Sequence, residues 1–182
     1  MTDAPADDLD RALAARLARG DQAAFGALYD RHTTYLYRFA LRLTAGDSAA
    51  AEDLVHDAWV LGVERLASFQ WRSSLRTWLA AFVVNGARTR WRDDARVLPI
   101  DDTHVGGDAP LRGRLERIDL QRALAALAPG FRMVLILHDA EGYTHEEIGR
   151  LLDIDAGTSK SQLSRARAAM RRALGATEGT GT

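Results

Sequence analysis

A helical period runs through almost the whole chain, and this feature limits the possible folds most. Apolar residues recur at steps of three and four, whereas no stretch keeps the strict alternation that is typical of a β-strand. Hydrophobic residues make up 47% of the 182 positions, which is ample for packed helical cores. The sequence therefore predicts an all-α protein.

One break divides this pattern. Residues 96–113 contain two prolines, three glycines and no apolar period, which is typical of a linker. Cap residues and apolar spacing predict helices at Leu9–Arg19, between Asp21 and Gly46, and at Ala49–Leu66, Leu75–Asp93, Leu115–Leu127 and Phe131–Glu141. We therefore expect two small helical domains, residues 9–95 and 114–175, joined by a flexible linker, residues 96–113.

Residues 143–172 have the form of a helix-turn-helix. Thr144 and Glu147 can form a capping box at the start of a first helix, and Asp155 can cap a second. Residues 158–172 then hold five cations and no carboxylate. Because a solvated helix face usually mixes both signs of charge, this pattern favours a helix that enters the DNA major groove. An amphipathic helix with a solvated basic face is the alternative.

The two faces of this basic helix are expected to differ. Its inward face is predicted to consist of Leu163, Ala166, Met170 and Leu174. Its outward face carries hydroxyl groups and arginines, which can contact phosphates or base edges, namely Thr158, Ser161, Arg165 and Arg172.

Aromatic residues and arginines are interleaved within residues 68–92. Aromatic rings stack on unpaired bases and arginines follow the phosphate backbone, so this combination suits single-stranded nucleic acid. Trp71 is expected in a loop between helices, where it could receive a flipped base. A packed core is the better interpretation for Trp78, Leu79, Phe82 and Val83.

The helix expected before this segment has an acidic side. Asp53, Asp57 and Glu64 share one face, and apolar residues beside them can pack inward. Such a ridge suits docking onto a basic partner surface, although a solvated face is the alternative. The spacing of Asp53, His56 and Asp57 is compatible with a metal, but no second cluster completes a site, so no metal is expected.

Composition restricts the function further. The net charge is −1, so the isolated chain should bind DNA only modestly, because strong independent binding usually needs a basic surplus. There are no cysteines, which excludes disulfides, thiolate metal sites and cysteine catalysis. The acidic N-terminus is unlike a secretory signal, and no apolar run could span a bilayer, so we expect a soluble cytoplasmic protein.

Taken together, these motifs resemble the extracytoplasmic-function (ECF) sigma factors of the sigma-70 family of bacterial RNA polymerase. The segment AEDLVHDAWV is similar to the family's polymerase-docking helix, and SFQWRSSLRTWLAAFVVNGAR to its segment that melts and reads the −10 promoter element. The segment from Leu124 to Leu174 is similar to the domain that reads the −35 element. The family commonly shows Arg-Gly-Glu where this chain has Gln70-Trp71-Arg72, and valine where it has Ser159.

The resemblance implies a non-catalytic initiation subunit without cofactors, whose partners are core RNA polymerase, promoter DNA and an anti-sigma factor. The implied polymerase-binding residues are Glu52, Asp53, His56 and Asp57. The implied −10 contacts are Phe69, Trp71, Arg72, Ser73, Arg76, Asn85 and Arg88. The implied −35 contacts are Thr158, Ser159, Lys160, Ser161, Gln162, Ser164, Arg165 and Arg167.

Two other classes of protein remain open from the residues alone. A stand-alone helix-turn-helix regulator would dimerise and bind palindromic duplex DNA without polymerase. A helical enzyme would use the aspartate, histidine and glutamate residues, but these are scattered and lack a phosphate-binding loop or paired histidines.

Overall fold

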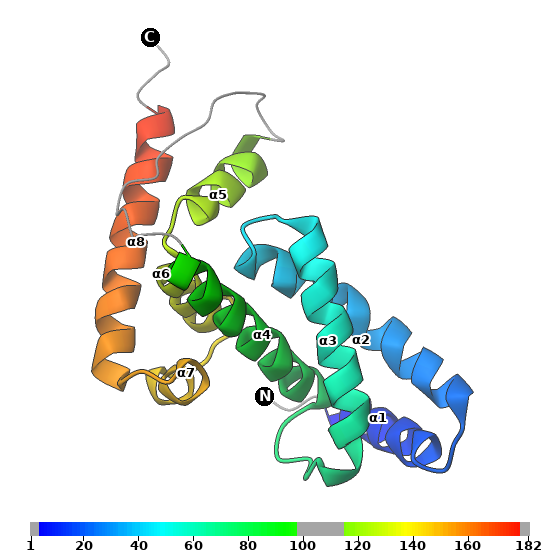
Figure 1. Cartoon of the computed structure of the whole chain (residues 1–182). Helices are drawn as coiled ribbons and strands as arrows, with labels where there is room; N and C mark the ends of the chain where they lie inside the picture. Colours follow the sequence, from blue (N-terminus) through cyan, green and yellow to red (C-terminus); the bar gives the residue numbers. More distant parts are fainter. Residues whose placement is uncertain (1–3, 98–114, 179–182) are drawn as a thin grey trace.

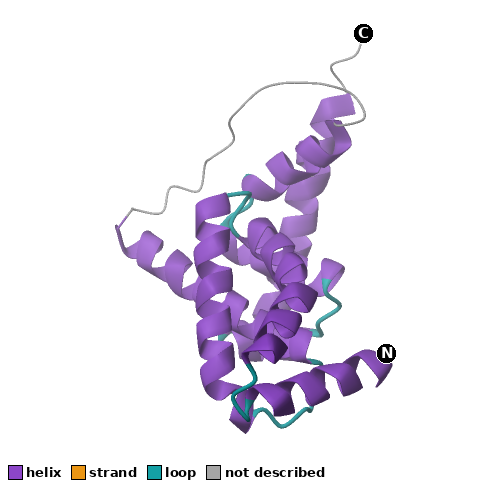
Figure 2. Ribbon diagram, turned by 90° about the vertical axis from the view of Figure 1, so that its right-hand side faces the viewer, coloured by secondary structure: helices purple, strands orange, loops and turns teal. Residues whose placement is uncertain are grey.

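The computed structural model describes residues 4–97 and 115–178, and helices with short connections make up this part of the chain (Figures 1 and 2). The all-α prediction is confirmed. The elements are α1 (Ala4–Leu17), α2 (Gln22–Leu43), α3 (Ser48–Arg65), η1 (Leu66–Ser68), α4 (Leu75–Val97), α5 (Leu115–Ala125), α6 (Pro129–Leu135), η2 (Ile136–Ala140), α7 (His145–Leu152) and α8 (Ala156–Glu178). The predicted linker lies outside the described residues except for its first two positions, which belong to α4.

Two predicted helix starts are confirmed at the aspartates that cap them, whereas the first helix begins at Ala4 and not at the predicted Leu9. The Asp21 carboxylate accepts hydrogen bonds from the backbone N–H groups of Ala23 and Ala24, and Asp47 accepts one from Ala50. These bonds satisfy amide groups that have no partner inside the helix. Gly46, just after α2, has φ +90°, a conformation that favours glycine.

Helices α1 to α4 form a first bundle. In Figure 1 α3 lies beside both α2 and α4, and α1 crosses one end of α2. Its centre consists of fully buried side chains, including Leu28, Leu36, Phe39, Leu79 and Val83. Tyr29 is 40% exposed, because it lies at the edge of the bundle against the rings of Phe25 and Trp59.

Helices α5 to α8 form a second bundle in which α8 packs on α5, α6 and α7. Leu163, Ala166 and Met170 of α8 are buried, as predicted. Leu174 is 37% exposed, so the prediction that it faces inward is wrong. The helix expected at Phe131–Glu141 begins at Pro129 and changes to a π-helical turn, η2.

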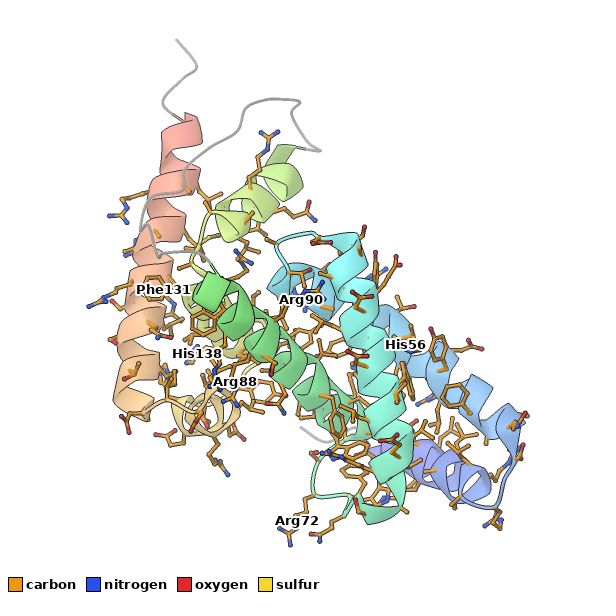
Figure 3. The ribbon with its side chains drawn as sticks, viewed as in Figure 1. His56, Arg72, Arg88, Arg90, Phe131 and His138 are labelled. Carbon is orange, nitrogen blue, oxygen red and sulfur yellow. The ribbon has the colours of Figure 1, made fainter. Side chains whose placement is uncertain are left out.

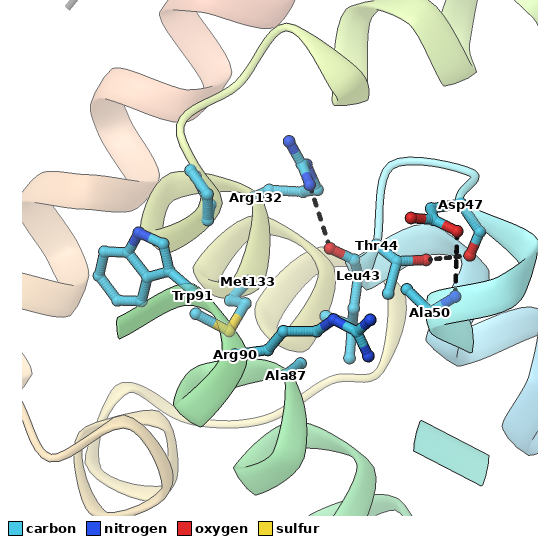
Figure 4. Close-up of a pocket in the computed structure, with 10 residues that line it drawn as sticks. Leu43, Thr44, Asp47, Ala50, Ala87, Arg90, Trp91, Arg132 and Met133 are labelled. Carbon is cyan, nitrogen blue, oxygen red and sulfur yellow. Dashed lines mark hydrogen bonds between the residues drawn. The ribbon is translucent and has the colours of Figure 1, made fainter. Parts of the chain in front are cut away.

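The two bundles share one continuous apolar core, which the sequence did not predict. Buried side chains of the second bundle, among them Val134, Leu137 and Ile148, join the core of the first. Arg132, itself buried, donates a hydrogen bond from Nη1 to the carbonyl oxygen of Leu43 at the end of α2, 3.1 Å away (Figure 4). This contact borders a cavity of about 190 Å³ between α2, α3, α4 and α6.

Within the described residues, no helix is both long and apolar enough to cross a membrane.

Candidate polymerase and nucleic-acid interfaces

The acidic side of α3 is open to solvent. Glu52, Asp53, His56 and Asp57 are all exposed, and Figure 3 shows His56 on the outer side of the helix. The opposite side of α3 is buried through Leu54, Val55, Ala58 and Trp59. The four polar residues thus form one continuous surface on a rigid helix, which we call the acidic face of α3.

One residue of the acidic face has a partner within the chain. Arg90 of α4 lies with Nη1 3.3 Å from Asp53 Oδ2, and both side chains are largely exposed. Exposed pairs of this kind contribute little to stability, so Asp53 can exchange Arg90 for a partner's cation at small cost. Among the described residues, no three histidine, aspartate or glutamate side chains come together in a way that could hold a metal ion.

The loop between η1 and α4 carries a cluster of aromatic rings. Phe69 lies 4.8 Å from Trp71 and 4.6 Å from Trp78, and Trp78 contacts Phe82 at 4.9 Å between ring centroids. All four rings are half-buried. The core prediction is therefore confirmed for Leu79 and Val83, which are fully buried, but Trp78 and Phe82 lie at its edge.

Trp71 has an unusual backbone conformation, with φ +55°. This left-handed region is costly for a residue with a bulky side chain. It is also the position where the family commonly has glycine, which adopts such angles freely. The Trp71 backbone therefore keeps the shape of a glycine turn while it presents an indole.

The other predicted −10 residues lie at the end of this loop and along α4. Arg72 and Ser73 are exposed, and Figure 3 shows Arg72 pointing away from the body of the protein. The guanidinium of Arg76 lies 5.1 Å from the centre of the Tyr35 ring. Asn85 is exposed but lies about 15 Å further along the helix axis than the loop.

Arg88 has a different environment from the other arginines. It is half-buried on α4, whose neighbour at this point is α7 of the second bundle, and its Nε is buried without a hydrogen-bond partner (Figure 3). The structure therefore brings Phe69, Trp71, Arg72 and Ser73 together but leaves Arg88 at the contact between bundles.

The two helices of the helix-turn-helix form where predicted, and the capping box of the first is confirmed. Thr144 Oγ1 accepts a hydrogen bond from the Glu147 N–H, and the Glu147 carboxylate accepts one from the Thr144 N–H. The first helix ends at Asp153, which has φ +58°. A Cβ atom at Gly149 would lie 2.7 Å from the Ile154 carbonyl oxygen, so the tight turn between α7 and α8 needs glycine there.

Most predicted −35 residues lie on the solvent side of α8. Lys160, Ser161, Ser164 and Arg165 are exposed, and Thr158 and Gln162 are half-buried. Arg167 is also exposed, but Asp139 of η2 accepts hydrogen bonds from its Nε at 2.9 Å and its Nη2 at 2.5 Å. Asp139, which the sequence did not single out, thereby fixes the direction of Arg167.

Ser159 does not belong to this surface, and its assignment to DNA contact is corrected. It is fully buried, and its hydroxyl shares a hydrogen bond of 2.9 Å with His145 Nδ1. The position where the family commonly has valine is therefore an internal one. His145 also stacks on His138 at 4.6 Å, and burial, together with the nearby His138, lowers the pKa of His145.

The geometry defines a helical protein with an exposed acidic helix face, an aromatic loop and a basic helix-turn-helix, and comparisons with known proteins identify its family. Residues 28–97 match the sigma-70 region 2 family and residues 117–170 match sigma-70 region 4. The chain is 34% identical over 165 residues to the ECF RNA polymerase sigma factor SigM of Mycobacterium tuberculosis, covering 90% of this chain and 83% of that protein. It is 28% identical to the ECF RNA polymerase sigma-E factor of Escherichia coli, with 88% and 92% covered.

Solved structures of sigma factors are also similar to this chain. The sigma factor RpoE from Bartonella quintana, in complex with the anti-sigma factor NepR, has a TM-score of 0.62 and 28% identity, covering 82% of this chain and 96% of that one. CnrH, in complex with the cytosolic domain of CnrY, has a TM-score of 0.59 and 28% identity, covering 92% and 98%. The chain belongs to the ECF sigma factors, which direct bacterial RNA polymerase to promoters and assist DNA melting.

Proposed function

We propose that this sigma factor divides its work between the two bundles, with residues 9–95 holding polymerase and the −10 element and residues 114–175 reading the −35 element. The observation that carries this proposal is that the acidic face and the aromatic loop lie in the segment matching region 2, whereas the basic helix lies in the segment matching region 4. The subunit itself is non-catalytic and acts in the cytoplasm, where the polymerase is.

Polymerase docking is assigned to the acidic face of α3, namely Glu52, Asp53, His56 and Asp57. The supporting evidence is exposure, a rigid helical support and one weak internal pair, Asp53 with Arg90. Opposite charges on two partners steer their encounter and fix their orientation, so a basic polymerase surface is the expected counterpart.

The −10 element is assigned to the loop at Phe69, Trp71, Arg72 and Ser73. An extruded base can stack on the half-exposed rings while the exposed arginine contacts a phosphate. Unpairing a base costs a few kcal/mol in general, and its capture offsets part of that cost, so melting becomes selective for sequence. We place Arg76 and Asn85 in the same function along α4.

The −35 element is assigned to the exposed residues of α8, namely Thr158, Lys160, Ser161, Gln162, Ser164, Arg165 and Arg167. A net charge of −1 means that this helix alone should hold DNA weakly. Joining two weak readers through one polymerase raises their combined affinity. We also infer control by an anti-sigma factor, because the structural relatives RpoE and CnrH were solved with NepR and CnrY.

Co-purification with bacterial core RNA polymerase tests the proposal. The wild-type chain should form a stable one-to-one complex, and Asp53→Arg/Asp57→Arg should lower its affinity at least about tenfold. Asp8→Arg/Asp30→Arg, which reverses two exposed charges elsewhere, should leave binding unchanged. If the chain failed to bind polymerase but bound palindromic duplex tightly as a dimer, it would be a stand-alone regulator.

A further inference from the structure

Trp71 needs support to keep its conformation, and the structure shows two contacts that give it. Its ring lies 4.8 Å from the ring of Phe69, two residues earlier in the same loop. The guanidinium carbon of Arg11 lies 5.1 Å from the centre of the indole ring. A guanidinium over an indole is an attractive cation–π contact, and it can stabilise a backbone conformation that the residue would not adopt alone.

Arg11 comes from a distant part of the chain. It lies on α1, before the segment that matches region 2, and is separated from Trp71 by the whole of α2 and α3. No local sequence pattern connects the two residues, which explains why the sequence did not indicate Arg11.

The neighbour of Arg11 fixes its helix in place. Asp10 is only 2% exposed, and its carboxylate accepts a hydrogen bond of 2.9 Å from Arg31 Nε and lies 2.9 Å from His32 Nε2. Leu13 and Ala14, one turn further on, are buried against the bundle. Because α1 is anchored by a buried carboxylate, the exposed Arg11 has a defined position beside the loop.

We propose that Arg11 is a positioning residue of the single-strand reader. Its guanidinium holds the indole ring half-exposed above the left-handed backbone of Trp71. An unpaired base therefore meets a stacking surface that is already formed. A fixed ring loses less conformational entropy on binding than a mobile one, and this gain appears as affinity. This inference rests on the proposed function of the loop, and it adds a residue of α1 to the single-strand binding site.

The test uses the holoenzyme formed from core polymerase and the full chain. A single-stranded 12-nucleotide ligand is first selected from a random pool by the wild-type holoenzyme, and its affinity is then measured by fluorescence anisotropy. Arg11→Gln should weaken binding about two- to fivefold, the size expected for an exposed cation–π contact. Arg19→Gln, which removes an exposed arginine just after α1, is the matched control and should bind as wild type.

A double-mutant cycle separates positioning from direct contact. In a Trp71→Ala background, Arg11→Gln should cause no further loss of affinity. The salt dependence of affinity in Arg11→Gln should also match that of wild type. A lost phosphate contact would instead reduce the slope of log affinity against log salt concentration by about 0.7. A loss that persists without Trp71, or equal binding by wild type and Arg11→Gln, would overturn the inference.

Different results would show that the loop does not bind single-stranded DNA at all. If the wild-type holoenzyme selected no single-stranded ligand, or if Trp71→Ala bound the ligand as tightly as wild type, the loop would not be the reader. Unchanged thermal midpoints and polymerase affinities in all variants would show that the bundle and the docking face are intact.

Discussion

Arg132 joins the ends of two helices that belong to different bundles. Its guanidinium donates hydrogen bonds to the carbonyl oxygens of Leu124, Ala125 and Leu127 at the end of α5 and just beyond it, and to that of Leu43 at the end of α2. Helix C-termini carry partial negative charge, which favours a cation there. Burial lowers the pKa of Arg132, but a guanidinium remains charged in proteins, so the carbonyl groups take the place of a carboxylate.

We expect Arg132→Met to lower the free energy of unfolding by about 3 kcal/mol, because several buried carbonyl groups lose their donors. Arg132→Lys should recover less than half of this loss, since one ammonium cannot reach four acceptors. Urea denaturation measures both effects, with the exposed Arg165→Met as control, which should change stability by less than about 0.5 kcal/mol. A similar loss of stability in Arg165→Met would contradict the stabilising role of the Arg132 hydrogen bonds.

His32 should make stability depend on pH. It is 3% exposed, and burial lowers its pKa despite the opposing attraction of Asp10. Arg31 already pairs with Asp10, so His32 can remain neutral. The folded state then binds fewer protons than the unfolded state, whose histidine pKa is about 6.5, so stability is complete above pH about 6.5 and falls as pH decreases. Urea denaturation between pH 5.5 and 7.5 should show this slope in wild type and a flatter one in His32→Gln.

At the scale of the element, α8 contains two arginines with different surroundings. Arg165 is exposed, whereas Arg167 is held by two hydrogen bonds to Asp139. With a promoter selected by the holoenzyme from a randomised library, Arg165→Ala should weaken binding of the −35 duplex by about 1–3 kcal/mol if it contacts a base. Changed DNA melting with unchanged −35 binding would reverse the assignment of the two bundles.

Asp139→Asn tests the orientation of Arg167. The amide keeps the size of the side chain but removes its charge, so Arg167 loses its fixed direction and −35 affinity should fall by less than it does in Arg165→Ala. The positive charge on α8 is unchanged, so the slope of affinity against salt should match wild type. A stronger dependence on salt would instead show that Asp139 had been keeping Arg167 away from phosphate.

Helices could be predicted from the sequence where the residues that start them lie next to one another in the chain. Asp21, Asp47 and the Thr144–Glu147 capping box act within one turn, so residue type and spacing identify them. Periodicity shows which residues share a face, but not where the neighbouring helix ends. For this reason the sequence placed Leu174 inside and Ser159 outside, and the structure reverses both.

Contacts between distant segments could not be predicted in this way. The exposed acidic face of α3 and the aromatic loop are runs of nearby residues, and they were found. Arg11 beside Trp71 and Asp139 beside Arg167 depend on how whole helices pack, so no signal in one sequence identifies them.

At the scale of the whole molecule, the proposed division of work requires the packing of the two bundles to change. Positions −35 and −10 are separated by roughly 25 base pairs, or about 85 Å of duplex, whereas the two bundles share a core. Glu141 helps to hold them together, because its carboxylate accepts hydrogen bonds from the Tyr35 hydroxyl and from Arg42 Nη2, the latter at 2.5 Å. Burial, followed by Glu141 itself, raises the pKa of Tyr35, so its hydroxyl keeps the proton that it donates.

We therefore expect the free chain to be closed and the polymerase-bound chain to be open. Because the sequence has no cysteine, dyes can be attached to Ala49→Cys and Ala126→Cys, one exposed site on each bundle. Energy transfer should be high in the free chain and should fall when core polymerase is added.

Glu141→Gln weakens a partly exposed ion pair and should raise the open fraction of the free chain about fivefold, or roughly 1 kcal/mol, whereas Glu146→Gln on α7 should not. Equal transfer in the free and bound states would mean that the shared core persists on the polymerase, and that one bundle alone reads the promoter.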